Sequence, residues 1–155
     1  MSASRTFDRR LAALVNAKAA PALQGGLKGA EKESLRVTPR GLIAKTPHPR
    51  ALGSALANEH ITTDYSEALI ELVTPPFPHT WELLQYLCDL HKFVYRHLED
   101  ELLWATSMPC AIKGEESIPI AEYGKSNVGT MKTVYRRGLG HRYGRVMQAI
   151  AGVHF

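Results

Sequence analysis

Apolar residues recur at intervals of three and four in three segments of the chain, which is the spacing of amphipathic helices. We expect the first helix over residues 5–19, the second from 80 to about 104 and the third from about 128 to 150. The third segment contains Gly138 and Gly140. Each glycine weakens a helix interior by about 1 kcal/mol, so a kink or break is expected at these two positions.

Two further segments, residues 31–37 and 64–75, have the composition of β-strands but contain carboxylates. Strand residues two apart point to the same face, so Glu31 and Glu33 share a face that continues as apolar side chains toward a core. In the second segment Glu71 interrupts an apolar row. A carboxylate desolvated in this way is costly unless a cation or several hydrogen-bond donors compensate it. Two such strands indicate an acidic metal site.

The residues between these two segments predict shorter elements. Pro39 and Gly41 have the chemistry of a turn, so residues 31–45 are expected to form a β-hairpin. A short helix is expected at residues 51–56, ahead of the second acidic strand.

The last four residues, 152–155, have the β-branched and aromatic content of a strand that is just beginning. A domain rarely ends at such a point. We therefore expect residues 1–155 to be the N-terminal part of a single domain that is truncated after Phe155. A short edge strand at a true C-terminus is the alternative.

The composition is that of one ordinary globular domain, with 155 residues, 45% hydrophobic and 22% charged. No stretch approaches the roughly 20 apolar residues that a membrane helix requires, and the N-terminus lacks the apolar core of a signal peptide. Cys88 and Cys110 have no metal-ligand spacing. These observations predict a cytoplasmic protein with no membrane partner.

The chain has a formal net charge of +4, and its basic excess is concentrated in the last third. Such a cluster can bind nucleic acid, phosphate or an acidic ligand, or it can be a solvated helix face. An RNA-binding domain built on this region would lack the aromatic residues on a sheet that are typical of such modules. We therefore expect no nucleic-acid partner.

Five possible metal ligands lie on or beside the expected strands: Glu31, Glu33, Asp64, Glu71 and His154. Oxygen-rich sites select hard cations, and Mg²⁺ is the usual choice where phosphate chemistry occurs. The alternative for Glu31 and Glu33 is an exposed, solvated strand face. The alternative for Glu71 is a salt bridge to Arg36 or Lys32.

The run Gly29-Ala30-Glu31-Lys32-Glu33-Ser34-Leu35-Arg36-Val37 resembles the opening of glutamate–cysteine ligases (γ-glutamylcysteine synthetases) of the proteobacterial type. The likeness continues, in the same order, in four further blocks at residues 48–56, 61–75, 103–110 and 123–155. Five blocks in the right order are far more specific than any single motif. The chain departs at Ala30, where a larger aliphatic residue is usual, and at Tyr65, where Phe is common.

The resemblance implies an α+β, glutamine-synthetase-like fold, in which a mainly antiparallel sheet with flanking helices carries the metal site. It implies ATP-dependent ligation of L-glutamate, through its γ-carboxyl, to L-cysteine via γ-glutamyl phosphate, which is the first step of glutathione biosynthesis. Family members are several hundred residues longer, and the missing part carries most ATP contacts and a further metal-binding glutamate. The 155 residues are then the N-terminal part of a ligase catalytic domain and inactive alone.

Motif positions carried over from the family make the same five residues ligands of Mg²⁺, with ATP as co-substrate. Mn²⁺ is a second candidate because His154 is an imidazole ligand. The pocket for the cysteine substrate is similar at Tyr65, Tyr135, Arg136, Leu139 and Gln148. Arg136 would offer a cationic fork to the α-carboxylate of that substrate. A non-catalytic metal- or ligand-binding module that uses the acidic sheet is the alternative function.

Overall fold

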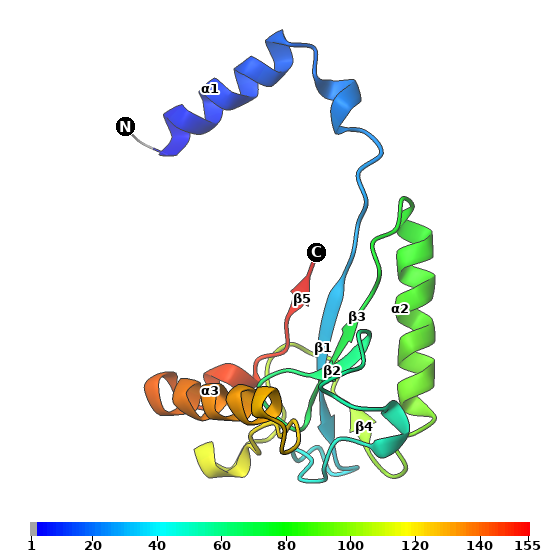
Figure 1. Ribbon diagram of the computed structural model, residues 1–155, viewed down its shortest axis with the longest axis vertical. Helices are drawn as coiled ribbons and strands as arrows, with labels where there is room; N and C mark the ends of the chain where they lie inside the picture. The colour runs from blue at the N-terminus through cyan, green and yellow to red at the C-terminus, as the bar shows by residue number, and fades with distance from the viewer. Residues whose placement is uncertain (1–2) are drawn as a thin grey trace.

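Five strands form one antiparallel sheet in residues 3–155, which are the part of the chain that the computed structural model describes (Figure 1). Helices lie on both sides of this sheet, so the fold is α+β, as predicted. The strands are β1 (Glu31–Val37), β2 (Ile61–Thr63), β3 (Leu69–Val73), β4 (Leu102–Leu103) and β5 (Val153–His154). The α-helices are α1 (Ala3–Asn16), α2 (Thr80–Tyr95) and α3 (Asn127–Tyr143). Short 3-10 helices span Ala20–Leu23, Arg50–Leu52, Glu115–Ser117 and Met147–Ala149.

Strand β1 is the centre of the sheet. Its partner on one edge is β3, which in turn pairs with β2. Its other edge is shared by two short strands, with β5 opposite the first residues of β1 and β4 opposite the last (Figure 1). The strand expected at residues 152–155 therefore forms and pairs with the first acidic strand.

The two faces of the sheet belong to two separate apolar clusters. On one face, Ile70 and Leu72 of β3 and Ile61 of β2 pack with α2 residues such as Val94. On the other face, the core contains Leu35 and Val37 of β1, Leu69 of β3 and, at its margin, Leu139 of α3. Helices α2 and α3 accordingly lie on opposite sides of the sheet (Figure 1).

Two of the predicted helices end earlier than their apolar spacing indicates. Helix α2 ends at Tyr95, and after Glu99, which has a φ of 50°, the next apolar residues form strand β4. Helix α3 ends at Tyr143, ahead of Gly144 at a φ of 81°. The expected break at Gly138 and Gly140 was wrong, since α3 is continuous through both positions.

The predicted hairpin at residues 31–45 forms only in part. Its turn is closed by Gly41, which has a φ of 73° and donates its N–H to the Thr38 carbonyl. The returning segment pairs with β1 through a single bridge between Val37 and Ile43. The helix expected at 51–56 is reduced to one 3-10 turn, which Gly53 ends at a φ of 86°.

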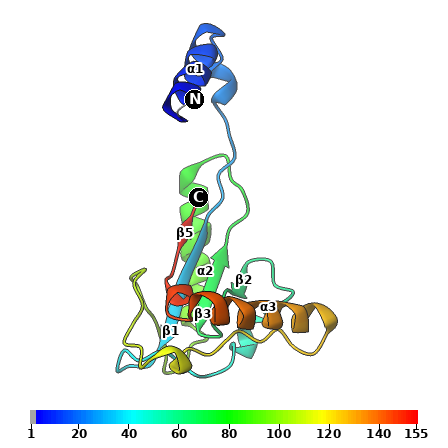
Figure 2. The ribbon, with the colours of Figure 1, turned by 90° about the vertical axis from the view of Figure 1, so that its left-hand side faces the viewer.

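Helix α1 forms where it was expected, but it lies away from the sheet, at the end of an extended segment (Figures 1 and 2). Its apolar side chains are exposed; Phe7, for example, is 65% accessible. Within residues 3–155 the structure contains no helix with the length and apolar character needed to span a membrane.

A buried ion pair fixes the end of β1 that is remote from Glu31. Arg36 is fully buried, and its guanidinium lies 2.6 Å from the Glu101 carboxylate. The same guanidinium donates to the Thr46 hydroxyl and to the Thr46 and Glu67 carbonyls. Glu67 in turn accepts hydrogen bonds from the backbone N–H groups of His48 and Glu122, so this network joins four loops to the central strand.

Candidate active site on the acidic face of the sheet

Strand pairing brings the two acidic strands together. Glu33 of β1 lies directly opposite Glu71 of β3, so both side chains are on the same face of the sheet. Thr62 of β2 lies opposite Glu71 on its other side. This face of the sheet, called the acidic face below, continues into the core through Leu35, as the alternation of side chains along a strand predicted.

Glu31 and His154 form the second pair on this face. They are opposite each other in the β1–β5 register, and His154 Nδ1 lies 3.0 Å from Glu31 Oε2. This hydrogen bond, with the charges of Glu33, Glu31 and Glu71, raises the pKa of His154. The His154 side chain is 61% accessible to solvent and that of Glu31 is 46% accessible.

Glu33 is the most buried carboxylate of the group, at 9% exposed. Its Oε2 accepts the N–H of Gly152 at 2.6 Å, and its own N–H donates to the Gly152 carbonyl. Burial raises the pKa of Glu33 despite this hydrogen bond. The sequence did not identify Gly152 as part of the site; its position two residues before His154 was the available signal.

Glu71 has the most perturbed carboxyl group. Burial raises its pKa to about 7, and the neighbouring carboxylates of Asp64, Glu33 and Glu31 contribute in the same direction. Within the described residues it has no basic ion-pair partner. The alternative of a salt bridge to Arg36 or Lys32 is wrong, because both side chains face the other side of β1, where Arg36 pairs with Glu101 and Lys32 donates to the Ser34 hydroxyl.

Asp64 and Arg136 are brought together although the resemblance assigned them to different sites. Arg136 Nε donates to the Asp64 carbonyl at 2.5 Å, and its Nη2 lies 3.8 Å from the carboxylate. The guanidinium lies over the Tyr123 ring, 4.6 Å from its centre, and the Tyr123 hydroxyl donates to the Asp64 carbonyl at 2.9 Å. Tyr123 is thus a supporting residue that the sequence pattern did not indicate.

The donor types of the acidic face fit a hard divalent cation, because the carboxylates of Asp64, Glu33 and Glu31 lie near enough to raise the pKa of Glu71, and no basic side chain in the described part of the chain forms an ion pair with it. The side chains are not gathered around one point, however. Among residues 3–155 no three His, Cys, Asp or Glu side chains are close enough together to hold a single metal ion. The Glu31 carboxylate instead forms a hydrogen bond with His154, and the Glu33 carboxylate accepts the Gly152 N–H. The assignment of these residues as metal ligands therefore remains a prediction.

The residues assigned to the cysteine pocket do not form one open cavity in this structure. Tyr65 is 1% exposed, and its hydroxyl, which lies beneath Gly140 of α3, has no hydrogen-bond partner within the described residues. Leu139 packs against the same core. Tyr135 is 58% exposed on α3, and Gln148 is partly buried in the segment that follows. The assignment of these residues also remains a prediction.

A small pocket of about 300 Å³ opens beside the Glu31–His154 pair. Its wall includes Gly29, Thr74 and the terminal Phe155, which is 88% exposed. The acidic face is therefore open to solvent at the end of β1 where the carboxylates lie.

Comparison with known proteins identifies relatives over nearly the whole chain. The glutamate–cysteine ligase family matches residues 11–155. A glutamate–cysteine ligase of Alcanivorax borkumensis is 58% identical over 149 residues, which are 96% of this chain and 28% of that enzyme. One from Pseudomonas putida is 55% identical over 152 residues, or 98% of this chain and 29% of the relative. The chain thus spans less than a third of the length of these relatives.

Solved structures agree with the sequence relatives. The chain is similar to a glutamate–cysteine ligase of Francisella tularensis in complex with AMP, with a TM-score of 0.81 and 42% identity over 84% of this chain and 26% of that one. It is also similar to a bifunctional glutathione synthetase of Pasteurella multocida, with a TM-score of 0.74 and 34% identity over 83% of this chain and 16% of that one. The extent of the family match, together with these identities, shows that this chain belongs to the glutamate–cysteine ligase family.

Proposed function

We propose that this chain supplies the acidic part of the active site of an ATP-dependent glutamate–cysteine ligase. The observation that supports this most directly is the position of Glu33 opposite Glu71, with Glu31 and His154 beside them on one face. Carboxylates grouped on one sheet face, of which Glu33 and Glu71 have no basic ion-pair partner among the described residues, are suited to a cation that accompanies a polyphosphate. The family relationship supports the reaction that we propose for this cluster.

In the proposed reaction the γ-carboxylate of glutamate attacks the γ-phosphorus of ATP, which forms γ-glutamyl phosphate and releases ADP. The amine of cysteine then attacks the activated carbonyl, the amide bond forms, and phosphate leaves. Mg²⁺, when bound, neutralises the polyphosphate and the charge that builds up during phosphoryl transfer; Mn²⁺ is the second candidate. Glu31, Glu33, Asp64, Glu71 and His154 would hold the metal ions.

Arg136 is proposed to orient the α-carboxylate of the cysteine substrate. Its guanidinium is already fixed by the Asp64 carbonyl and by the Tyr123 ring, so it lies at the border of the acidic face. A fork held in this way loses little side-chain freedom when it binds a carboxylate. The proposed pocket is completed by Tyr135 and Leu139 of α3, by Tyr65 beneath this helix and by Gln148.

Because the chain spans 28% of the Alcanivorax borkumensis ligase, we propose that it forms the N-terminal part of a catalytic domain whose remaining sequence supplies most ATP contacts. The proposed location is the cytoplasm, where the proposed substrates glutamate, cysteine and ATP are available.

The test is a chimera in which this chain replaces the matching segment of the Alcanivorax borkumensis ligase. We expect ADP release that requires both glutamate and cysteine, and its loss in Glu33→Gln and Glu71→Gln. Glu59→Gln is the matched control, because Glu59 is exposed and lies outside the acidic face. Full activity in both site variants would refute the role of the acidic face. Binding of Mg²⁺ without any ADP release would favour a non-catalytic metal module.

A further inference from the structure

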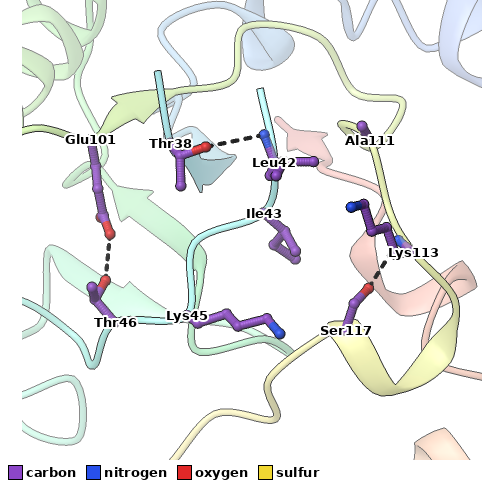
Figure 3. Close-up of a pocket in the computed structure, with 9 residues that line it drawn as sticks. All are labelled: Thr38, Leu42, Ile43, Lys45, Thr46, Glu101, Ala111, Lys113 and Ser117. Carbon is purple, nitrogen blue, oxygen red and sulfur yellow. Dashed lines mark hydrogen bonds between the residues drawn. The ribbon is translucent and has the colours of Figure 1, made fainter. Parts of the chain in front are cut away.

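A second, larger pocket lies at the other end of β1 from Glu31. It has a volume of about 540 Å³, within the range of about 300–1,000 Å³ that small-molecule sites occupy. Residues that follow β1 form one side, and residues 111–117 form the opposite side (Figure 3). The apolar residues Leu42, Ile43 and Ala111 make up much of its lining.

The backbone holds these walls in place. Leu42 pairs with Ala111 in a parallel bridge, and Ile43 pairs with Val37 at the end of β1. The Leu42 N–H also donates to the Thr38 hydroxyl at 3.3 Å (Figure 3). On the opposite wall the Lys113 N–H donates to the Ser117 hydroxyl at 3.2 Å, and this hydroxyl donates to the Gly114 carbonyl. The pocket is therefore formed before any ligand enters.

The charge in this pocket is positive. The side chains of Lys45 and Lys113 both extend into the space around Ile43 (Figure 3). Neither ammonium has an acidic ion-pair partner among the described residues. The one carboxylate in the lining, Glu101, is already neutralised, because it pairs with Arg36 at 2.6 Å and accepts the Thr46 hydroxyl.

We propose that this pocket binds a small organic anion that has an apolar body and a doubly charged end, either a phosphate monoester or a dicarboxylate. Leu42, Ile43 and Ala111 would contact the apolar body. The two ammonium groups would bind the charged end, where charge-assisted hydrogen bonds are about twice as strong as neutral ones. The hydroxyls of Thr38 and Ser117 lie at the two walls and are already engaged with backbone groups, so they fix the walls around the ligand.

The test is a titration of the ¹⁵N-labelled chain, followed by NMR, with phenyl phosphate as the first probe and phenylsuccinate as the second. We expect saturable shifts of the amide signals of Thr38, Leu42, Ala111 and Ser117. The probe with the lower dissociation constant identifies the preferred charged end. Benzyl alcohol, which has the same ring without charge, should bind at least about tenfold more weakly, since it loses both charge-assisted contacts.

The deciding variant is Lys45→Met/Lys113→Met, because methionine retains an apolar stem and removes only the charge. It should weaken binding of the better anionic probe at least about tenfold. Lys125→Met, at an exposed lysine outside this pocket, is the matched control and should bind like the wild type. Unchanged affinity in the double variant, shifts that map elsewhere, or no shift with either anion would overturn the proposal.

Discussion

Glu33 and Glu71 face each other across the β1–β3 pair, each one the directly opposed partner of the other. Like charges at opposed positions of an antiparallel pair destabilise a sheet. The fold tolerates the arrangement through the Gly152 N–H, which donates to Glu33, and through the raised pKa of Glu71. A substitution in this pair is therefore expected to change both the stability of the fold and the proposed cation site.

The first prediction concerns the pH dependence of stability in metal-free buffer. The pKa of Glu71 is about 7 in the folded protein and near 4.5 in the unfolded chain, so the folded state retains a proton between these values. The stability that the folded state gains from protonated Glu71, relative to the ionised form, is therefore fully present below about pH 4.5 and is lost as the pH rises through 7. Glu71→Gln removes this loss.

Relative to the wild type, Glu71→Gln should gain about 1–2 kcal/mol in free energy of unfolding between pH 5 and pH 8, after allowance for screening by water at a half-buried site. Urea unfolding at the two pH values measures this difference. Glu59→Gln, at an exposed position, should show no pH-dependent gain. Parallel pH curves for wild type and Glu71→Gln would contradict the assignment.

A second prediction concerns the cation. At pH 7 addition of millimolar MgCl₂ should raise the melting temperature of the chain by about 3 °C, since binding to the folded state alone stabilises it. Binding should also release protons, because Glu71 is partly protonated at this pH and a metal ligand must lose its proton. Both effects should be absent in Glu33→Gln and should reverse with EDTA. A melting-temperature shift of equal size in Glu33→Gln would indicate that Mg²⁺ acts elsewhere.

The acidic face could be predicted from the sequence because side-chain alternation along a strand depends only on spacing. Glu31 and Glu33 share a face, and Glu71 lies in an apolar row, as that spacing indicates. The same rule places Arg36 and Lys32 on the opposite face from Glu33, so a salt bridge from either of them to Glu71, the alternative left open by the sequence, needed a register that the structure does not have. The opposition of Glu33 and Glu71 required the register between strands, which depends on the whole connection between them.

Other features depend on backbone conformations that the spacing of apolar residues does not predict. Leu98 and Leu102 continue the apolar spacing of helix α2, yet the helix ends at Tyr95, and beyond the positive φ of Glu99 Leu102 lies in strand β4. The family resemblance assigned Tyr65 and Leu139 to a substrate pocket, but the structure buries Tyr65 and packs Leu139 against the core. A resemblance assigns a shared role to a set of residues. It does not predict how exposed each of them is in this chain.

A third prediction tests the buried ion pair at the end of β1. Arg36→Met should lower the free energy of unfolding by about 3 kcal/mol, since it leaves the Glu101 carboxylate without its partner in a mostly buried site. Arg50→Met, at an exposed arginine nearby, should change stability by less than about 0.5 kcal/mol. In a double-mutant cycle with Glu101→Gln, the double variant should lose less free energy of unfolding than the sum of the losses in the two single variants. Additive losses would show that the two side chains do not interact.

The last prediction concerns the packing of α3 on the sheet. A Cβ atom at Gly140 would overlap the hydroxyl of Tyr65, which is buried and cannot move aside. Gly140→Ala should therefore destabilise the chain by about 2 kcal/mol. Gly138→Ala is the matched control, since its Cβ would meet only the flexible Arg142 guanidinium at 3.4 Å, and it should gain up to about 1 kcal/mol of helix stability.

Tyr65→Phe separates this overlap from other effects of the alanine. Among residues 3–155 the Tyr65 hydroxyl has no hydrogen-bond partner, so its removal should leave the free energy of unfolding nearly unchanged or slightly higher. In the Tyr65→Phe background, Gly140→Ala should lose most of its cost, because the overlapping atom is gone. Thermal unfolding of the wild type and the three variants of the cycle measures the coupling. If Gly140→Ala is as well tolerated as Gly138→Ala in the wild-type background, α3 does not pack on Tyr65 as described.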